Sequence, residues 1–209
     1  MRKFIQTGLF PLALIFPFMS EDCEKTVEVT VPVATDIPFQ INSTNAVYSD
    51  VETVNFAADV EKAIADAGLD DETIIDIRIE SVVYKITQNT SGPNTLLSGA
   101  LRVGPENLSN PAAATSLAQL VNVNLNAVVD QEQSPGLNPN GVTFLNDQLR
   151  NAIVLGTGSG AFKAFIDGQV APSPPPNLAF RLTAEVNLTV VVLQKVEVPS
   201  GCDNPLAGL

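Results

Sequence analysis

The chain has 209 residues, of which 45% are hydrophobic, so it is long and apolar enough to bury a core and is not an intrinsically disordered protein. Its formal net charge of −12 argues against nucleic acid and anionic membranes as partners, because both are bound through Lys and Arg. The absence of histidine excludes a Ser-His-Asp or Cys-His nucleophile and removes the commonest transition-metal ligand.

The N-terminus has the layout of an export signal. Arg2 and Lys3 precede an uncharged stretch over residues 4–20, which gives way to acidic residues. A membrane-spanning helix needs roughly 20 apolar residues, and this stretch is shorter and is broken by Pro11 and Pro17. We predict an export signal over residues 1–20 and a single extracytoplasmic domain over residues 21–209. A retained N-terminal anchor is the alternative.

The two cysteines lie near the two ends of the mature chain. In an oxidising compartment Cys23 and Cys202 are expected to form a disulfide. The alternative is a lipid-modified Cys23, which would leave Cys202 free and tether the protein to a membrane. The residues before Cys23 are Ser20, Glu21 and Asp22, which differ from a lipoprotein signal, so we favour the disulfide.

The first third of the chain predicts strands followed by one helix. Thr26–Val33 alternates apolar and polar residues, and Pro32 places this strand at a sheet edge or at its end. Turn residues around Asp36 lead into a continuing strand, and residues 42–50 are expected to form a polar loop. Apolar residues at helical spacing then predict a helix over residues 56–67.

Residues 73–87 predict one long strand with a defect. Its apolar residues change from odd to even positions, which requires an inserted residue, so we expect a β-bulge near Glu80–Val82. A turn over residues 89–94 and a returning strand over residues 97–103 would make this pair a hairpin.

The remaining elements follow in alternation. We predict helices over residues 112–120 and 142–153, and strands over residues 121–129, 162–170 and 180–192. Most neighbouring strands are expected to be antiparallel. The fold class is therefore mainly β, an antiparallel β-sandwich of immunoglobulin-like type with two or three short helices in its connections.

One acidic cluster is a candidate calcium site. It consists of Asp66, Asp70, Asp71, Glu72 and Asp76. Calcium prefers six to eight oxygen ligands, but the spacing does not match the EF-hand loop. We favour a solvated acidic corner, and we expect no cofactor and no catalytic residues.

Three further motifs have simple structural explanations. Residues 156–160 are glycine-rich but follow a helix, which is the reverse of a phosphate-binding loop. The prolines of residues 172–176 are expected to form a rigid connector, with partner recognition as the alternative. Glycosylation-type triplets at Asn42, Asn89, Asn107 and Asn187 are attributed to the Asn- and Thr-rich composition.

The export signal, the early Cys23, the Thr/Val-rich first strand and the segment Ile77–Val82 together resemble uncharacterised bacterial cell-envelope proteins, secreted or lipoprotein-type β-sandwich domains. The resemblance covers the first half of the chain. It implies a location in the cell envelope and no activity.

These observations favour a non-enzymatic extracytoplasmic module for surface structure, assembly or adhesion, with protein partners or self-association. In one version Thr26–Val33 adds to a neighbour's sheet by strand exchange. One alternative is a carrier of an apolar ligand or lipid, with helices 56–67 and 142–153 covering a curved sheet. Another is a carboxylate-based glycan hydrolase, which needs two carboxyl groups facing each other across a cleft. A membrane is a partner only if Cys23 is lipidated.

Overall fold

The computed structural model describes residues 24–69, 73–92, 94–171 and 178–197. Residues Thr26–Gln194 form one compact unit, and a second unit, Met1–Lys25 with Lys195–Leu209, lies mostly outside the described residues. The predicted export signal and both cysteines also lie outside them. No helix in the described ranges is both long and apolar enough to cross a membrane.

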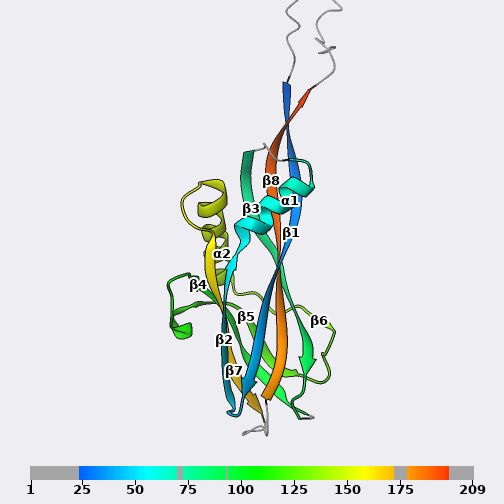
Figure 1. Ribbon diagram of the computed structural model, residues 1–209, viewed down its shortest axis with the longest axis vertical. Helices are drawn as coiled ribbons and strands as arrows, with labels where there is room; N and C mark the ends of the chain where they lie inside the picture. The colour runs from blue at the N-terminus through cyan, green and yellow to red at the C-terminus, as the bar shows by residue number, and fades with distance from the viewer. Residues whose placement is uncertain (1–23, 70–72, 93, 172–177, 198–209) are drawn as a thin grey trace, which may run out of the picture. The chain divides into compact units, whose positions relative to one another are not determined.

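In the described part of the chain, eight strands form two antiparallel four-stranded sheets (Figure 1). The first sheet has the order β1-β8-β3-β6, made by Glu24–Ser43, Leu178–Glu197, Thr73–Asn89 and Glu132–Gln133. The second has the order β2-β7-β4-β5, made by Val47–Asn55, Ala161–Ala171, Leu96–Pro105 and Thr115–Asn124. The predicted antiparallel β-sandwich is confirmed.

The strand order refines the predicted type of sandwich. The first strand is the neighbour of the eighth, the second of the seventh, the third of the sixth and the fourth of the fifth. This nested pairing is the double Greek key of a jelly roll. In the immunoglobulin arrangement the first two strands are neighbours in one sheet, whereas here β1 and β2 lie in different sheets.

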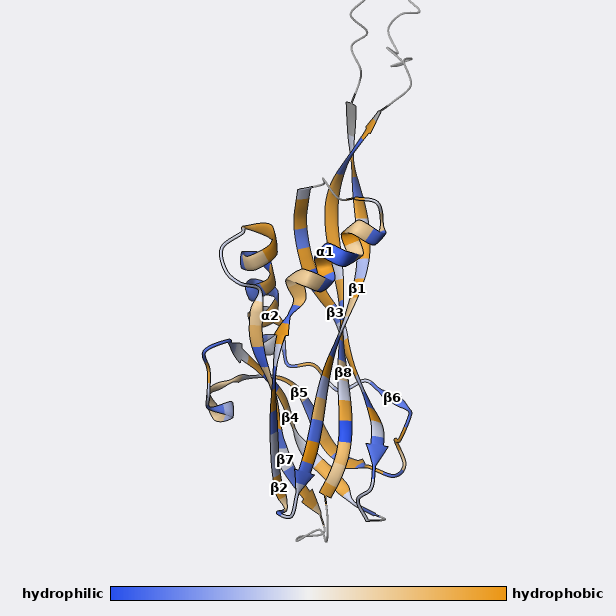
Figure 2. Ribbon diagram, viewed as in Figure 1, coloured by the Kyte–Doolittle hydropathy of each residue, from blue (hydrophilic) through white to orange (hydrophobic). Residues whose placement is uncertain are grey.

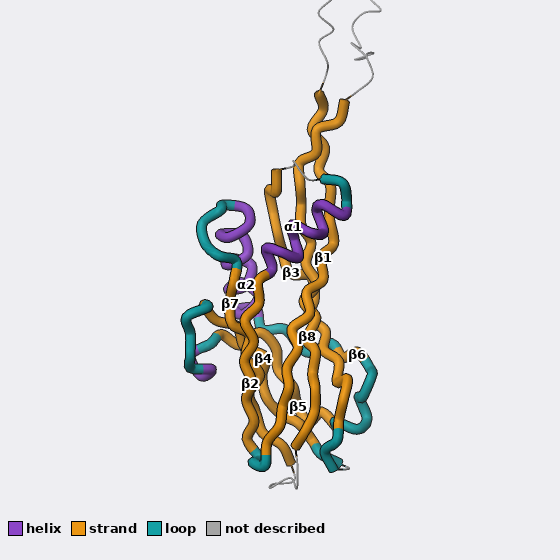
Figure 3. The backbone as a smooth tube through the Cα atoms, in the orientation of Figure 1, coloured by secondary structure: helices purple, strands orange, loops and turns teal. Residues whose placement is uncertain are grey.

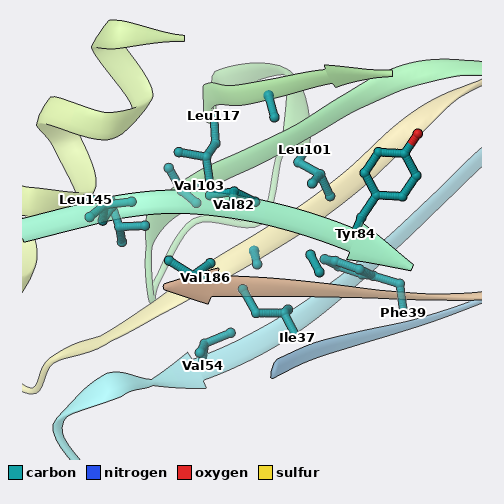
Figure 4. Packing of buried hydrophobic residues seen from close by; sticks show 14 of the residues in the cluster. Ile37, Phe39, Val54, Val82, Tyr84, Leu101, Val103, Leu117, Leu145 and Val186 are labelled. Carbon is teal, nitrogen blue, oxygen red and sulfur yellow. The ribbon is translucent and has the colours of Figure 1, made fainter. Parts of the chain in front are cut away.

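The core lies between the sheets, where alternate residues of each strand meet. The strands change between hydrophobic and hydrophilic residues along their length (Figure 2). Ile37 and Phe39 of β1, Val186 of β8, Val54 of β2 and Leu101 of β4 are all buried in this cluster (Figure 4). Full burial of such a side chain contributes about 1.5–3 kcal/mol, so the alternation defines which face of each strand turns inward.

The predicted β-bulge is confirmed. The register between β3 and β8 shifts between Ile79 and Ser81, which lets buried residues sit at odd positions before the bulge and at even positions after it. The backbone N–H of Ile79 donates to the Asn146 Oδ1 atom at 2.9 Å. A side chain of the helix that contains Asn146 thus provides the acceptor for this strand N–H.

Among the described residues, two α-helices occupy connections between strands (Figure 3). Helix α1, Phe56–Asp66, lies between β2 and β3, and its Asp59 accepts a hydrogen bond from the Thr35 hydroxyl of β1 at 2.7 Å. Helix α2, Pro139–Leu149, lies between β6 and β7 and continues into the π-helical turn η2, Arg150–Val154. Both predicted helices are confirmed, since their apolar faces enter the core.

The predicted hairpin of residues 73–87 and 97–103 is wrong, because β3 and β4 belong to different sheets. The connection between them is held near the start of β8, where the Thr90 N–H donates to the Ala179 carbonyl at 2.9 Å. An alternation of period two shows which face of a strand is buried but not which strand is its neighbour.

Three other predictions in this region and near the N-terminus are wrong. Residues 112–120 do not form a helix: the 3₁₀ turn Pro111–Ala113 leads into β5, which begins at Thr115. Pairing with β4 and burial of Leu117 and Leu120 outweigh helix propensity. Strand β5 ends at Asn124 rather than continuing to residue 129. Strand β1 passes through Asp36 without a turn.

Candidate interaction surface

The residues of the candidate calcium site, for which we favour a solvated corner, do not assemble into one group in the part of the chain that is described. Asp66 forms an ion pair with Lys62 at 2.6 Å, and Asp76 forms one with Arg150 at 3.7 Å. Asp70, Asp71 and Glu72 lie outside the described residues. No group of three acidic or cysteine side chains placed to hold a metal is found among the residues that are described, so the calcium site stays a prediction.

The disulfide between Cys23 and Cys202 and the proline-rich connector also lie outside the described residues. The glycine-rich segment ends a helix, as its position after a helix in the sequence indicates. Gly156 has a φ of +63°, and the Thr157 N–H donates to the Asn151 carbonyl at 2.7 Å. The segment then leads directly into β7, which leaves no helix N-terminus for a phosphate.

Carboxylates meet at one shallow depression on the outer side of the first sheet. Its volume is about 210 Å³, and it is lined by Asp36, Glu132 and Glu185 together with Lys85. Pockets that bind small molecules usually measure about 300–1,000 Å³, so this depression is small for a saccharide substrate.

The sheet edges decide whether another strand can be added. Strand β1 is an edge strand, as Pro32 predicts, and is paired with β8 of its own sheet. The Gln40 N–H of β1 points away from β8 and donates to the Asp50 carboxylate at 2.7 Å. Pro32 and Pro38 have the same parity as Gln40, so two positions along this free edge have no N–H donor.

Strand β2 is protected by charges that point inward, a known means of preventing edge-to-edge pairing. Asp50 and Glu52 share the inward parity of the buried Tyr48 and Val54. Burial raises the pKa of Glu52, and the neighbouring negative charge of Asp50 raises it further. An added strand at this edge would have to cover both carboxylates.

The other edges are short or covered. Strand β6 has two residues, and α2 and η2 pack beside the first half of β3. On β5, Ala118 is bridged by Leu137, and the Leu117 carbonyl accepts from the Asn138 N–H at 2.8 Å. Addition of a strand is therefore disfavoured along most of the sandwich.

The outer side of the second sheet, by contrast, carries exposed apolar residues on its two outer strands. We call it the valine face and define it by the outward residues of β2, β7, β4 and β5. It carries Val47, Val51 and Val121, which are 67%, 46% and 69% exposed. Outside this face, the large exposed hydrophobic residues in the described ranges are Leu155 and Val196.

Three cross-strand rows make up the valine face. Each row runs in the strand order β2, β7, β4, β5. The first row is Val47, Gln169 and Ser98, followed on β5 by the bulge of Val121 and Asn122. The second row is Ser49, Asp167, Ala100 and Gln119, and the third is Val51, Phe165, Arg102 and Ser116. The centre is a shallow depression of about 470 Å³. The exposed valines thus lie on the two outer strands, β2 and β5. The two middle strands carry Gln169, Asp167, Ser98 and Arg102, and their outward Ala100 and Phe165 are only 6% and 2% exposed.

The sheet has no inward side chains on β4 and β7 beneath the middle of the valine face, because two glycines pair there. Gly99 of β4 lies opposite Gly168 of β7, and the Tyr48 hydroxyl packs beneath both and donates to the Ser98 carbonyl at 3.4 Å. Burial raises the pKa of Tyr48 well above its ordinary value, and the charge of Asp167 adds to the effect.

The charges on the two outer sides of the sandwich differ. On the valine face the outward charged residues are Lys163, Arg102 and Asp167, which sum to +1. Arg102 Nε and Asp167 Oδ1 are 2.7 Å apart, and Lys163 Nζ donates to the Leu108 carbonyl at 3.0 Å. Within residues 26–194 the first sheet carries more acids than bases outside its core, namely Glu28, Asp36, Asp76, Glu80, Glu132 and Glu185 against Arg78, Lys85 and Arg181.

The amino-acid pattern does not predict this surface, because it does not predict β2. The inward positions of β2 include Asp50 and Glu52, while Val47 and Val51 point outward, so the segment was predicted to begin as a polar loop. The available signal was composition, since Val, Tyr and Thr are frequent in strands.

Comparisons with known proteins identify no family. The sequence matches no protein-family profile, and no curated protein is significantly similar. Among solved structures, one of Desmodium yellow mottle tymovirus is 14% identical with a TM-score of 0.33, over 94% of this chain and 99% of the other. One of infectious bursal disease virus strain Gx is 8% identical with a TM-score of 0.30, over 86% and 38%. Scores this low carry no argument, so the jelly-roll assignment depends on strand order alone.

Proposed function

We propose that this chain is a non-enzymatic, extracytoplasmic structural module that serves assembly or adhesion and associates with further copies of itself. The observation that carries this proposal is the valine face, where exposed apolar residues gather on the least acidic side of the sandwich. Exposed apolar patches on soluble domains are typical of interaction sites.

The non-enzymatic part of the proposal is supported by residue types. The chain has no histidine, and the carboxylates of the first sheet line a depression that is small for a substrate. The carrier alternative lacks a favouring observation, because Phe56 and Val60 of α1 and Leu145 and Leu149 of α2 belong to the packed core. A carrier would need these side chains to line a cavity.

The extracytoplasmic part depends on the N-terminal pattern and on the two cysteines. Intact mass of the mature protein from its native host, before and after reduction, tests it. A chain that begins near Glu21 and gains two hydrogens on reduction supports a secreted protein with a disulfide. An acylated N-terminus at Cys23 supports a membrane-tethered lipoprotein. An uncleaved chain would contradict a secreted protein and support the retained N-terminal anchor.

The strand-exchange version is the less supported form of self-association. Residues 26–33 belong to β1, which pairs with β8 of its own sheet. Pro32 removes one donor from its free edge, and the other edges are covered or charged, as described above. We therefore place self-association on a sheet face rather than on an edge.

Sedimentation equilibrium of the mature chain, from micromolar to millimolar concentration, tests self-association. We expect the average mass to rise above that of the monomer as the concentration increases. A mass that stays monomeric over the whole range would overturn the proposal.

A further inference from the structure

We propose that two copies of this chain pack valine face against valine face, related by a two-fold axis that runs parallel to the strands between β7 and β4. This inference rests on the proposed self-association and names the surface and the geometry that produce it. A two-fold interface requires a surface that is complementary to itself, and the charges and the register of the valine face meet this requirement.

Electrostatics favour this face for a second copy. Each chain has a formal net charge of −12, so two copies repel each other over most of their surfaces. The valine face is the exception, because its outward charges sum to +1 and two of them, Arg102 and Asp167, are already paired. Contact through the acidic outer side of the first sheet would bring like charges together instead.

The strand register matches the valines of one copy with those of the other. Val47 on β2 and Val121 on β5 stand at opposite ends of the same cross-strand row. A two-fold axis parallel to the strands exchanges the two ends of each row. It therefore places Val47 of each copy against Val121 of its partner. The two resulting contacts bury four valines that are exposed in the monomers.

The same rotation brings opposite charges together near the axis. Asp167 of β7 and Ala100 of β4 are direct neighbours in the middle row. The rotation exchanges β7 and β4, so Asp167 of one copy faces Ala100 of the other, one row away from Arg102. The two ion pairs then form a network of four alternating charges across the interface.

The size of the surface predicts a weak complex. Four strands about 4.8 Å apart and about five residues of each give a patch of roughly 19 by 17 Å. This patch has an area of roughly 320 Å² from these strand dimensions, whereas stable complexes bury about 800 Å² on each partner. We therefore expect dimerisation that depends on concentration, which suits a module whose copies are held together on a surface.

The first test locates the surface with a matched pair of variants. Val47→Asp and Leu155→Asp add the same charge at exposed positions, on and away from the valine face. We expect Val47→Asp to raise the dimer dissociation constant at least tenfold and Leu155→Asp to raise it less than threefold. Circular dichroism checks that both variants are folded. Equal effects would show that the surface is wrong while self-association stands.

The second test addresses the geometry by charge complementation. In the proposed dimer Val47→Asp/Val121→Lys forms two Asp–Lys contacts between copies. Positions 47 and 121 of one chain are separated by two strands, which excludes an ion pair within the chain. We expect this double variant to bind at least tenfold more tightly than Val47→Asp alone. Val47→Asp/Leu155→Lys is the control with the same total charge.

If both double variants bind equally, the two-fold arrangement is wrong. If the unsubstituted chain stays monomeric, the proposed function fails together with this inference. If it associates but neither Val47→Asp nor Val121→Lys changes the dissociation constant, only the inference fails.

Discussion

Single glycines control how closely β4 and β7 approach beneath the valine face. A Cβ atom on Gly168 would lie 2.2 Å from the Ser98 carbonyl oxygen and 2.6 Å from the Tyr48 hydroxyl, and one on Gly99 would lie 2.3 Å from the Asp167 carbonyl oxygen. These neighbours are mostly backbone atoms of paired strands, which cannot move without disturbing the sheet. The close approach of β4, β7 and the Tyr48 hydroxyl beneath the centre of the face therefore depends on the absence of two side chains.

Gly168→Ala is accordingly expected to lower the free energy of unfolding by about 1–3 kcal/mol, the usual cost of overpacking. Urea unfolding followed by circular dichroism measures the change. Gly136→Ala is the matched control, because a Cβ atom there has no neighbour within 4 Å. We expect this control to be neutral or slightly stabilising, since alanine reduces the entropy of the unfolded chain. Equal stability of the two variants would contradict this close packing of β4 against β7.

At the scale of elements, the bulge of β3 and helix α2 depend on each other. The bulge turns the buried face of the strand over, and the Ile79 N–H next to it is bonded by the Asn146 side chain instead of another strand. Helix α2 therefore acts as a cover for the edge of β3, and Arg150 adds an ion pair with Asp76 beside it.

Removal of the hydrogen bond between the Ile79 N–H and the Asn146 side chain should show whether the bulge of β3 depends on α2. Asn146→Ala leaves a partly buried N–H without its acceptor, which costs about 1–3 kcal/mol. We expect a loss of that size in urea unfolding and faster hydrogen exchange at the Ile79 amide. Asn140→Ala, an exposed position on the same helix, should change the unfolding free energy by less than about 0.5 kcal/mol. Unchanged exchange at Ile79 in the Asn146 variant would contradict this role.

Local patterns predicted most elements but not their neighbours. The bulge, α1, α2, β7 and β8 follow from periodicity, because each has one apolar face. The pairing of β3 with β8 instead of β4 joins residues about a hundred positions apart, and no local signal encodes it. Residues 112–120 have helix-forming composition, and only their pairing with β4 makes them a strand.

The candidate surface was harder to predict than the fold. Its valines are exposed, so they break the alternation that identifies a strand. Asp50 and Glu52 point inward at an edge, where a solvated loop is the simpler expectation from sequence. Exposed apolar residues at an interface and inward charges at a sheet edge reverse the apolar-inward, polar-outward alternation of a core strand.

For the whole molecule, two electrostatic effects oppose each other in the proposed dimer. The net charges of −12 on each copy repel over long distances, whereas Arg102 and Asp167 attract their counterparts at short range. The ion pair already exists at 2.7 Å within each chain, so dimerisation adds little to it. The long-range repulsion is entirely new in the dimer, and we expect it to dominate the salt dependence.

Salt should therefore strengthen the association. Raising the ionic strength from about 10 mM to 150 mM shortens the Debye length from roughly 30 Å to 8 Å, which screens the repulsion between two acidic molecules more than it weakens close contacts. We expect the dissociation constant measured by sedimentation equilibrium to fall several-fold over this range. Val47→Asp should bind more weakly at every salt concentration but follow the same trend, because it changes the contact and barely changes the total charge. A dissociation constant that rises with salt would mean that ion pairs across the interface, rather than apolar contact between valine faces, hold the copies together.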